Sequence, residues 1–205
     1  MSREARRDKP VVTATSGRIA PNLTRCGART ALLAPHGAGA GAAVEEIECR
    51  AERTPGGVSV TYEVRGDIER LAIPPRAPAA RRIDGLWEHT CFEAFVAVEG
   101  LDGYTELNFS PSGEWAAYTF DAYRAGRSRL EIAAPVIAVL ARRDRLVLSA
   151  AVDLPALPVV AGRPLRLGLC AVIEDKEGSL SYWALAHPSK RPDFHHPGGF
   201  VLALA

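Results

Sequence analysis

From Val44 onward, apolar and polar side chains alternate residue by residue, and this period of two constrains the fold more than any other feature of the sequence. In the stretch VSVTYEV, Val58, Val60, Tyr62 and Val64 alternate with polar residues. Successive side chains of a β-strand point to opposite faces, so this alternation is typical of strands with one buried face. The preceding stretch VEEIECRAER shows the same pattern, and TPGG between the two provides a hairpin turn. The sequence therefore predicts strands here rather than helices.

Strand-like runs continue to the C-terminus, separated by turn-forming residues. They lie at about 86–99, 104–110, 114–121, 130–141, 145–153, 164–174, 180–187 and 199–204. The Pro-rich stretch 73–85 cannot be a central strand because proline removes a backbone donor, and SPSG at 110–113 has the composition of a type I turn. The stretch FDAYRAGRSR also fits a short helix. About ten short strands predict an all-β fold, an antiparallel β-sandwich of jelly-roll-like type.

The first 43 residues have a different composition from the rest. They begin with charged residues and end in the small-residue stretch PHGAGAGAA, with few large apolar side chains between. Such a segment lacks the apolar surface that a folded core requires. We therefore expect residues 1–43 to form a flexible N-terminal extension and residues 44–205 to form one β-sandwich domain.

The overall composition argues against several classes of partner. Lys and Arg number 25 against 24 Asp and Glu, and a net charge of +1 gives no reason to expect nucleic-acid binding. No stretch of about 18 uninterrupted apolar residues is present, so we expect no membrane span. The first 30 residues interrupt every apolar run with charged or turn-forming residues, unlike a secretory signal. These features predict a cytoplasmic protein.

The four cysteines do not form a recognisable metal-binding or redox motif. Cys26, Cys49, Cys91 and Cys170 include no C-x-x-C pair, so neither a zinc ribbon nor a dithiol redox site is predicted. We expect free thiols.

The stretch LWEHTCFEAF concentrates residue types from which metal sites, nucleophilic sites and sugar-binding surfaces are built. If residues 86–99 form one strand, its side chains divide between two faces. The core face carries Phe92, Ala94, Val96 and Val98, and the opposite face carries Trp87, His89, Cys91 and Glu93.

Strand geometry argues against a metal site or a catalytic nucleophile in this stretch. Side chains four residues apart on a strand are separated by about 13 Å, so His89 and Glu93 cannot reach one ion. A nucleophilic pair of His89 and Cys91 lacks an identifiable orienting group or oxyanion donor. We therefore predict no catalytic residue, no metal and no cofactor, with an enzyme that uses His89 or Cys91 as a less favoured alternative.

A sugar-binding surface suits the same face better. Glu106, Asn108 and Ser110 point away from the core on the neighbouring hairpin, while Leu107 and Phe109 point into it. An indole ring stacks on the apolar face of a sugar, and carboxylate or amide groups pair with its hydroxyls. The alternative is structural, with Trp87 covering the edge of the sandwich and Glu93 paired with an Arg.

Other candidates lie near the C-terminus and in the loops. Trp183 alternates with Tyr182 and shares a face with His187, so Trp183 is either a second aromatic plate or a core residue. The adjacent pair His195 and His196, on a Pro-flanked loop, has no defensible ligand spacing and is expected to order the loop. Arg124 is a candidate anion anchor, although a surface ion pair is the commoner role for such an Arg.

Three stretches in order, LWEHTCFEAFV, YTELNFSPSGEWAAYTFDAYR and YWALAHP, resemble the small bacterial DOMON-like proteins. These form a branch of the superfamily of DOMON domains and family-9 carbohydrate-binding modules, and the likeness covers roughly residues 44–205. It implies a β-sandwich or jelly roll whose concave side holds a sugar or, in some relatives, haem. By this resemblance Trp87 and Glu93 match site residues of the family, and Trp183 corresponds to the second ring of an aromatic clamp.

The sequence departs from these relatives at two points. His89 and Thr90 stand where the sugar modules usually have an Asp. Haem-binding DOMON domains commonly use a Met and a His as axial ligands, whereas Met1 is the single methionine here. The resemblance therefore favours a sugar over haem.

Taken together, the sequence predicts a non-catalytic binding protein that recognises a sugar or similar small polar ligand on one face of a β-sandwich. An accessory protein-interaction module, with the same aromatic face as its interface, is the alternative. The predicted ligand-binding residues are Trp87, His89, Glu93, Asn108, Trp115, Trp183 and His187.

Overall fold

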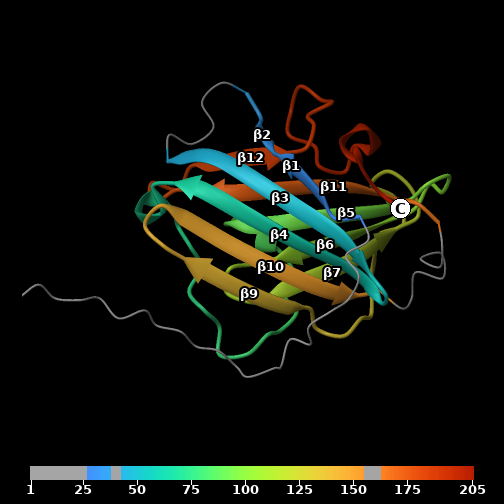
Figure 1. The fold of residues 1–205 in the computed structure, drawn as a ribbon, viewed down its shortest axis with the longest axis horizontal. Coiled ribbons are helices and arrows are strands. Elements are labelled where there is room, and N and C mark those ends of the chain that lie inside the picture. The colour runs from blue at the N-terminus through green and yellow to red at the C-terminus, as the bar shows by residue number, and fades with distance from the viewer. Residues whose placement is uncertain (1–26, 38–42, 155–162) are drawn as a thin grey trace, which may run out of the picture.

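Two antiparallel β-sheets pack face to face in the computed structural model, which describes residues 27–37, 43–154 and 163–205 (Figure 1). These residues contain thirteen strands and three short 3-10 helices, η1 (Ile68–Arg70), η2 (Leu86–Glu88) and η3 (Pro197–Gly199), but no α-helix. The predicted all-β sandwich is confirmed, with more strands than expected. None of the helices in the described ranges is long and apolar enough to cross a membrane.

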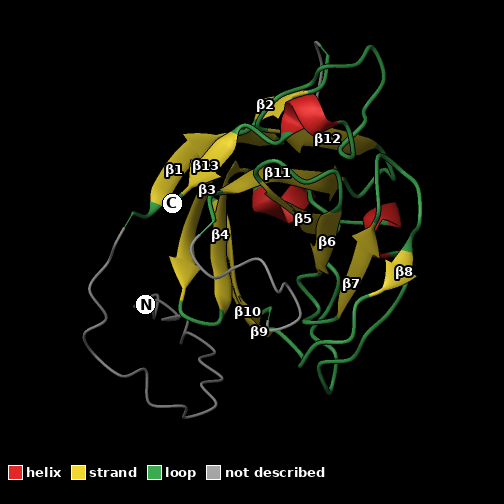
Figure 2. Ribbon diagram, turned by 90° about the vertical axis from the view of Figure 1, so that its right-hand side faces the viewer, coloured by secondary structure: helices red, strands yellow, loops and turns green. Residues whose placement is uncertain are grey.

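Sheet A has the strand order β1-β3-β4-β10-β9, and sheet B has the order β2-β12-β11-β5-β6-β7-β8, with β13 also paired to β11 (Figure 2). Sheet A consists of β1 (Arg29–Leu32), β3 (Val44–Thr54), β4 (Gly57–Gly66), β9 (Val136–Ala141) and β10 (Arg145–Asp153). Sheet B consists of β2 (Ala34–Pro35), β5 (Cys91–Val98), β6 (Tyr104–Phe109), β7 (Trp115–Phe120), β8 (Ser128–Arg129), β11 (Leu165–Glu174), β12 (Leu180–Ala184) and β13 (Leu202–Leu204).

Both hairpins expected from turn chemistry are present. Thr54 pairs with Gly57 at the tip of the β3–β4 hairpin, which leaves Pro55 and Gly56 as a two-residue loop. Between β6 and β7, the amide of Gly113 donates to the carbonyl of Ser110 over 2.9 Å and closes the turn. These turns fix the register of the β3–β4 and β6–β7 pairings.

The structure differs from the expectation in three segments. Strands β1 and β2 lie within the segment expected to be flexible, because β1 pairs with β3 and β2 pairs with β12; residues 1–26 and 38–42 of that segment lie outside the described residues. The strand expected from residue 86 begins at Cys91, after η2. The stretch FDAYRAGRSR is not a helix, since a turn closed between Ala122 and Ala125 leads into β8.

The core between the sheets contains the residues that alternation placed there. Phe92, Ala94, Val96 and Val98 of β5 all lie in it. Leu107 and Phe109 of β6 join them, also as predicted.

The outer face of sheet B, which points away from sheet A, is buried as well. A second apolar cluster there includes Phe95, Tyr104, Tyr118, Phe120 and Phe200. Residues 185–201, called the covering segment below, contribute Phe194 and Phe200 to this cluster. Both faces of sheet B are therefore buried. A ligand site can form between its outer face and the covering segment.

Gly168 on β11 allows the covering segment to come this close. A Cβ atom at this position would lie 2.5 Å from Cδ1 of Phe200, closer than real contacts allow. Phe200 instead stacks on Phe95, with ring centroids 5.6 Å apart and an angle of 18° between the rings. The missing side chain thus lets an aromatic anchor hold the segment on the sheet.

Candidate functional site

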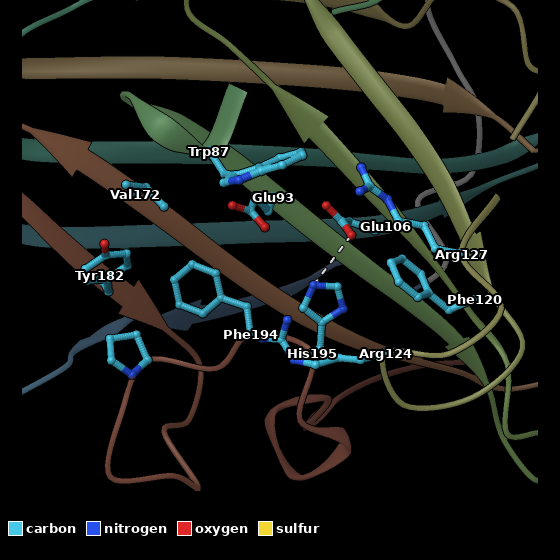
Figure 3. Close-up of a pocket in the computed structure, with 11 residues that line it drawn as sticks. Trp87, Glu93, Glu106, Phe120, Arg124, Arg127, Val172, Tyr182, Phe194 and His195 are labelled. Carbon is cyan, nitrogen blue, oxygen red and sulfur yellow. Dashed lines mark ion pairs between the residues drawn. The ribbon is translucent and has the colours of Figure 1, made fainter. Parts of the chain in front are cut away.

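A cavity of about 410 Å³ lies between the outer face of sheet B and the covering segment. Its size is in the range of small-molecule sites. Figure 3 shows that strands supply its floor and loops supply its walls. It is lined by Trp87, Glu93, Glu106, Phe120, Arg124, Arg127, Val172, Tyr182, Pro192, Phe194 and His195.

Two carboxyl groups from neighbouring strands form the centre of the floor. Glu93 on β5 is opposite Asn108 on β6, and Glu106 precedes Asn108 by two residues, so both Glu side chains leave the same face of the sheet. Diagonal neighbours of this kind are about 7–8 Å apart. The carboxyl groups lie beside each other between Trp87 and the ring of His195 (Figure 3).

Both carboxyl groups are almost fully buried. The exposed fraction is 4% for Glu93 and 5% for Glu106. Burial, followed by the nearby charge of Glu106, raises the pKa of Glu93 well above its usual value. Burial also raises the pKa of Glu106, although a hydrogen bond from Asn108 opposes that shift. Nδ2 of Asn108 donates to Oε1 of Glu106 over 2.7 Å, whereas no described residue forms a hydrogen bond or ion pair with the Glu93 carboxyl group.

His195 extends from the covering segment toward Glu106. The amide of Arg124 donates to the Tyr104 hydroxyl over 3.2 Å, and that hydroxyl lies 2.8 Å from Nδ1 of His195. Burial lowers the pKa of His195 to about 4, so the ring is neutral at pH 7. When the Tyr104 hydroxyl donates to Nδ1, the proton of the neutral ring resides on Nε2. That atom lies 3.7 Å from Oε2 of Glu106, which is too long for a hydrogen bond.

The proximity of His195 and Glu106 is therefore not a charged pair at neutral pH. The pKa of Glu106 is raised from 4.5, while that of His195 is lowered to about 4. As the pH falls, Glu106 loses its charge before His195 gains one. The contact thus places a neutral N–H donor and a carboxyl group on two sides of the cavity.

An ion pair ties the loop after β7 to the covering segment. Arg124 donates to Asp193 over 2.7 Å, and the Tyr123 hydroxyl donates to the other Asp193 oxygen over 2.6 Å. Burial alone would raise the pKa of Asp193, but these two hydrogen bonds outweigh it and hold the pKa below its usual value. Arg124 has a φ of 52°, the one positive φ among described non-glycine residues. This ion pair agrees with the role expected for Arg124, although its side chain also borders the cavity.

Arg127 supplies the second cation at the cavity. Its guanidinium carbon lies 4.0 Å from the ring centroid of Tyr118 and 5.4 Å from that of Trp87. The two rings meet edge to face at 6.2 Å. Trp87, the residue in the centre of η2, is thus held at the rim by aromatic and cationic contacts.

Of the seven predicted ligand-binding residues, Trp87 and Glu93 line the cavity and Asn108 lies directly behind it. Asn108 is fully buried and orients Glu106 through its amide group. The structure therefore brings these three together.

Trp115 and Trp183 lie on the opposite face of sheet B, in the core between the sheets. Their exposed fractions are 5% and 4%. The indole nitrogen of Trp183 donates to the Ser181 hydroxyl over 3.1 Å. The sequence allowed Trp183 to be either a second aromatic plate or a core residue, and in the structure it is a core residue. It therefore does not form an aromatic clamp with Trp87, which lies on the other face of the sheet.

His89 and His187 also lie outside the cavity. His89 follows η2, and its Nδ1 contacts Glu174 at 2.8 Å, with 66% of the side chain exposed. His187 donates to the carbonyl of Ala34 over 2.8 Å and so links the covering segment to β2. His89 does not share the face of Glu93 because the strand begins two residues after it.

Most of the remaining lining residues come from loops, where the sequence has no periodicity to guide a prediction. Arg127, Phe194 and His195 belong to this group. Tyr182 carried a usable signal, because alternation places it on the face opposite Trp183. His196, by contrast, orders the loop as expected, since its Nδ1 accepts a hydrogen bond from Gly198 at the start of η3.

The described residues contain no group of three or more His, Cys, Asp or Glu side chains arranged for a metal ion. Cys49, Cys91 and Cys170 are free and buried, as expected for unpaired thiols, and Cys26 lies outside the described residues. Burial raises the pKa of Cys91 well above its usual value, so its thiol is not activated as a nucleophile.

Comparison with known proteins shows similarity in fold only. No protein-family model and no curated protein matches the sequence. The fold is similar to the crystal structure of a protein from Bacteroides uniformis ATCC 8492 described as a putative carbohydrate-binding protein. The TM-score is 0.60 at 20% sequence identity, and the similarity covers 78% of this chain and 77% of the other. At this identity the comparison establishes a shared fold, and membership of the DOMON-like proteins stays a prediction.

Proposed function

We propose that the protein is a non-catalytic binding protein that holds a sugar or a similar small polar ligand between the outer face of sheet B and the covering segment. The observation that carries the proposal is the cavity of about 410 Å³, which combines the Trp87 ring with the buried, unpartnered carboxyl group of Glu93. Sites for small ligands have this character, with apolar walls and a few converging polar groups.

The chemistry of the lining suits a ligand with one apolar face and several hydroxyl groups. Trp87, Tyr182 and Phe194 offer ring surfaces to C–H groups. Glu93 and Glu106 accept hydrogen bonds, and Nε2 of His195 donates one. Hydrogen bonds to these groups offset the cost of removing the ligand's polar groups from water. The similar fold of a protein described as carbohydrate-binding is in keeping with this proposal.

A binding role is favoured over the enzyme that the sequence left as an alternative. His89 is exposed outside the cavity and pairs with Glu174. Cys91 is fully buried, and its raised pKa keeps it in the unreactive thiol form. Neither residue presents a nucleophile or base to the cavity.

Isothermal titration calorimetry against a panel of mono- and disaccharides tests the proposal. We expect the wild-type protein to bind at least one sugar, and Trp87→Ala to lose measurable binding because the ring surface is removed. His89→Ala is the matched control, since His89 lies near Trp87 in the chain but outside the cavity. No binding of any sugar by the wild-type protein would refute the proposed function.

A further inference from the structure

Glu93 is a buried carboxyl group without a partner. Its side chain lines the cavity with an exposed fraction of 4%, yet no described residue donates to it or pairs with it. The neighbour on β6, Asn108, uses its amide group on Glu106 instead. An ionised carboxylate buried in this way is costly unless something compensates its charge. A ligand that brings a cationic donor into the cavity supplies that compensation.

Glu106 leaves a second oxygen available at the same place. Its Oε1 accepts from Asn108 over 2.7 Å, but Oε2 faces Nε2 of His195 at 3.7 Å, beyond hydrogen-bond length. The two Glu residues are diagonal neighbours on β5 and β6, about 7–8 Å apart at the backbone. The two carboxyl groups lie side by side in the cavity, so an ammonium group placed there faces both of them (Figure 3).

The charges around the cavity also favour a cationic ligand. Arg124 is neutralised by Asp193, and His195 is neutral because its pKa is lowered to about 4. Arg127 then supplies one positive charge against the two carboxyl groups of Glu93 and Glu106, so the cavity reaches a net charge of −1 only when Glu93 also gives up its proton. A monocation balances this charge, while a phosphate or a carboxylate on the ligand would increase the imbalance.

The aromatic side chains that line the cavity also favour a cationic ligand. Trp87, Phe120, Tyr182 and Phe194 all border the cavity. The faces of aromatic rings attract cations, most strongly where water is excluded. The rings therefore add to the attraction exerted by the carboxylates.

We infer that the ligand is a small polyhydroxylated amine, in its simplest form an amino sugar, whose ammonium group binds between Glu93 and Glu106. This inference rests on the proposed function, because it assigns the ligand class to the same cavity. The hydroxyl groups of the ligand contact the remaining polar groups, and its ring lies against the aromatic side chains.

Matched pairs of sugars that differ in one substituent test the inference. Glucose, glucosamine and N-acetylglucosamine differ at C2, which carries a hydroxyl, an ammonium and a neutral amide respectively, and the galactose series repeats the comparison. Calorimetry is done slightly below neutral pH, where the amine is protonated, with EDTA present to remove adventitious metal. We expect the ammonium form to bind about tenfold or more tightly than its hydroxyl and amide counterparts, as for a charge-assisted hydrogen bond.

Proton release gives a second, independent measurement. Burial raises the pKa of Glu93, so part of the free protein carries a proton there that an ammonium ligand displaces. Titrations in two buffers of different ionisation enthalpy should show release of protons with the amino sugar and none with the neutral sugar.

Substitutions of the two Glu residues test whether the ammonium group of the ligand binds between them. Glu93→Gln keeps the shape of the side chain and removes its charge, so the preference for the amine over its neutral counterparts should disappear. Glu106→Gln should weaken the preference in the same way. Glu174→Gln is the control, because this carboxylate lies outside the cavity and pairs with His89.

The outcomes separate the two proposals. If neutral sugars bind as tightly as their amines, the inference fails and the proposed function stands. If no sugar of either kind binds, both are refuted. If the amine is preferred but Glu93→Gln keeps the preference, the assignment of the ammonium to this carboxyl pair is wrong.

Discussion

Nε2 of His195 lies 3.7 Å from Oε2 of Glu106, and Nδ1 of the same ring lies 2.8 Å from the Tyr104 hydroxyl. The His195 ring thus connects the covering segment to Tyr104 and Glu106 of β6. The same side chain borders the cavity and places a hydrogen-bond donor in it. The protonation of His195 therefore affects the cavity and the stability of the fold together.

His195 should make the protein less stable as the pH falls. Its folded pKa, about 4, is below the usual 6.5, so between these values the unfolded chain binds a proton that the folded protein does not. The free energy of unfolding should therefore decrease by about 3 kcal/mol over this window. Urea unfolding of wild type and His195→Gln at about pH 7 and pH 4 measures the difference. Glu93 and Glu106 have raised pKa values and act in the opposite direction, but they are present in both proteins. Parallel pH profiles for the two proteins would contradict this assignment.

The three Trp residues should divide into two classes. Trp115 and Trp183 lie in the core between the sheets, so replacement by Ala should lower the free energy of unfolding by about 3–5 kcal/mol. Trp87 is half-buried at the cavity rim, and its replacement by Ala should cost less stability while abolishing ligand binding. Urea unfolding and calorimetry on all three variants give both readouts. A stable Trp183→Ala variant that fails to bind ligand would contradict this division.

The link from Tyr123 and Arg124 to Asp193 should control how firmly the covering segment is held. Asp193→Asn removes the charge that attracts Arg124 and weakens the hydrogen bond from Tyr123. We expect faster amide hydrogen exchange in residues 185–201 and faster ligand dissociation, by about tenfold if about 1.4 kcal/mol is lost. Glu69→Gln, which removes an exposed ion pair with Arg143 elsewhere, serves as the control. Unchanged exchange in the covering segment would show that this link does not hold it.

The buried thiols should resist alkylation in the folded state. Burial raises the pKa of Cys49 to about 12 and those of Cys91 and Cys170 well above their usual value. In a Cys26→Ser background, iodoacetamide should modify none of the three until urea unfolds the protein, as mass spectrometry can show. Rapid modification of native Cys91 would instead revive the enzyme hypothesis.

The strands and the intersheet core could be predicted because alternation over many residues is a strong and redundant pattern. Phe92 on β5 and Leu107 on β6 lie where it placed them. The short strands β1 and β2 were missed because they have few residues and mostly exposed side chains, and their partners are distant in sequence. Only tertiary pairing identifies strands of this kind.

The site was harder to predict because sheet B is buried on both faces. Alternation shows that Trp183 and Tyr182 point in opposite directions, but it does not show which face packs against sheet A. Here Trp183 faces the core and Tyr182 borders the cavity. His195 and Arg127 come from irregular segments, where their position depends on packing such as the stacking of Phe200 on Phe95.

Successive side chains of β5 and β6 point to opposite faces of sheet B. Glu93 and Glu106 border the cavity, while their immediate neighbours Phe92 and Leu107 pack between the sheets. Substitutions at Glu93 or Glu106 can therefore change the lining of the cavity while Phe92 and Leu107 keep the packing between the sheets.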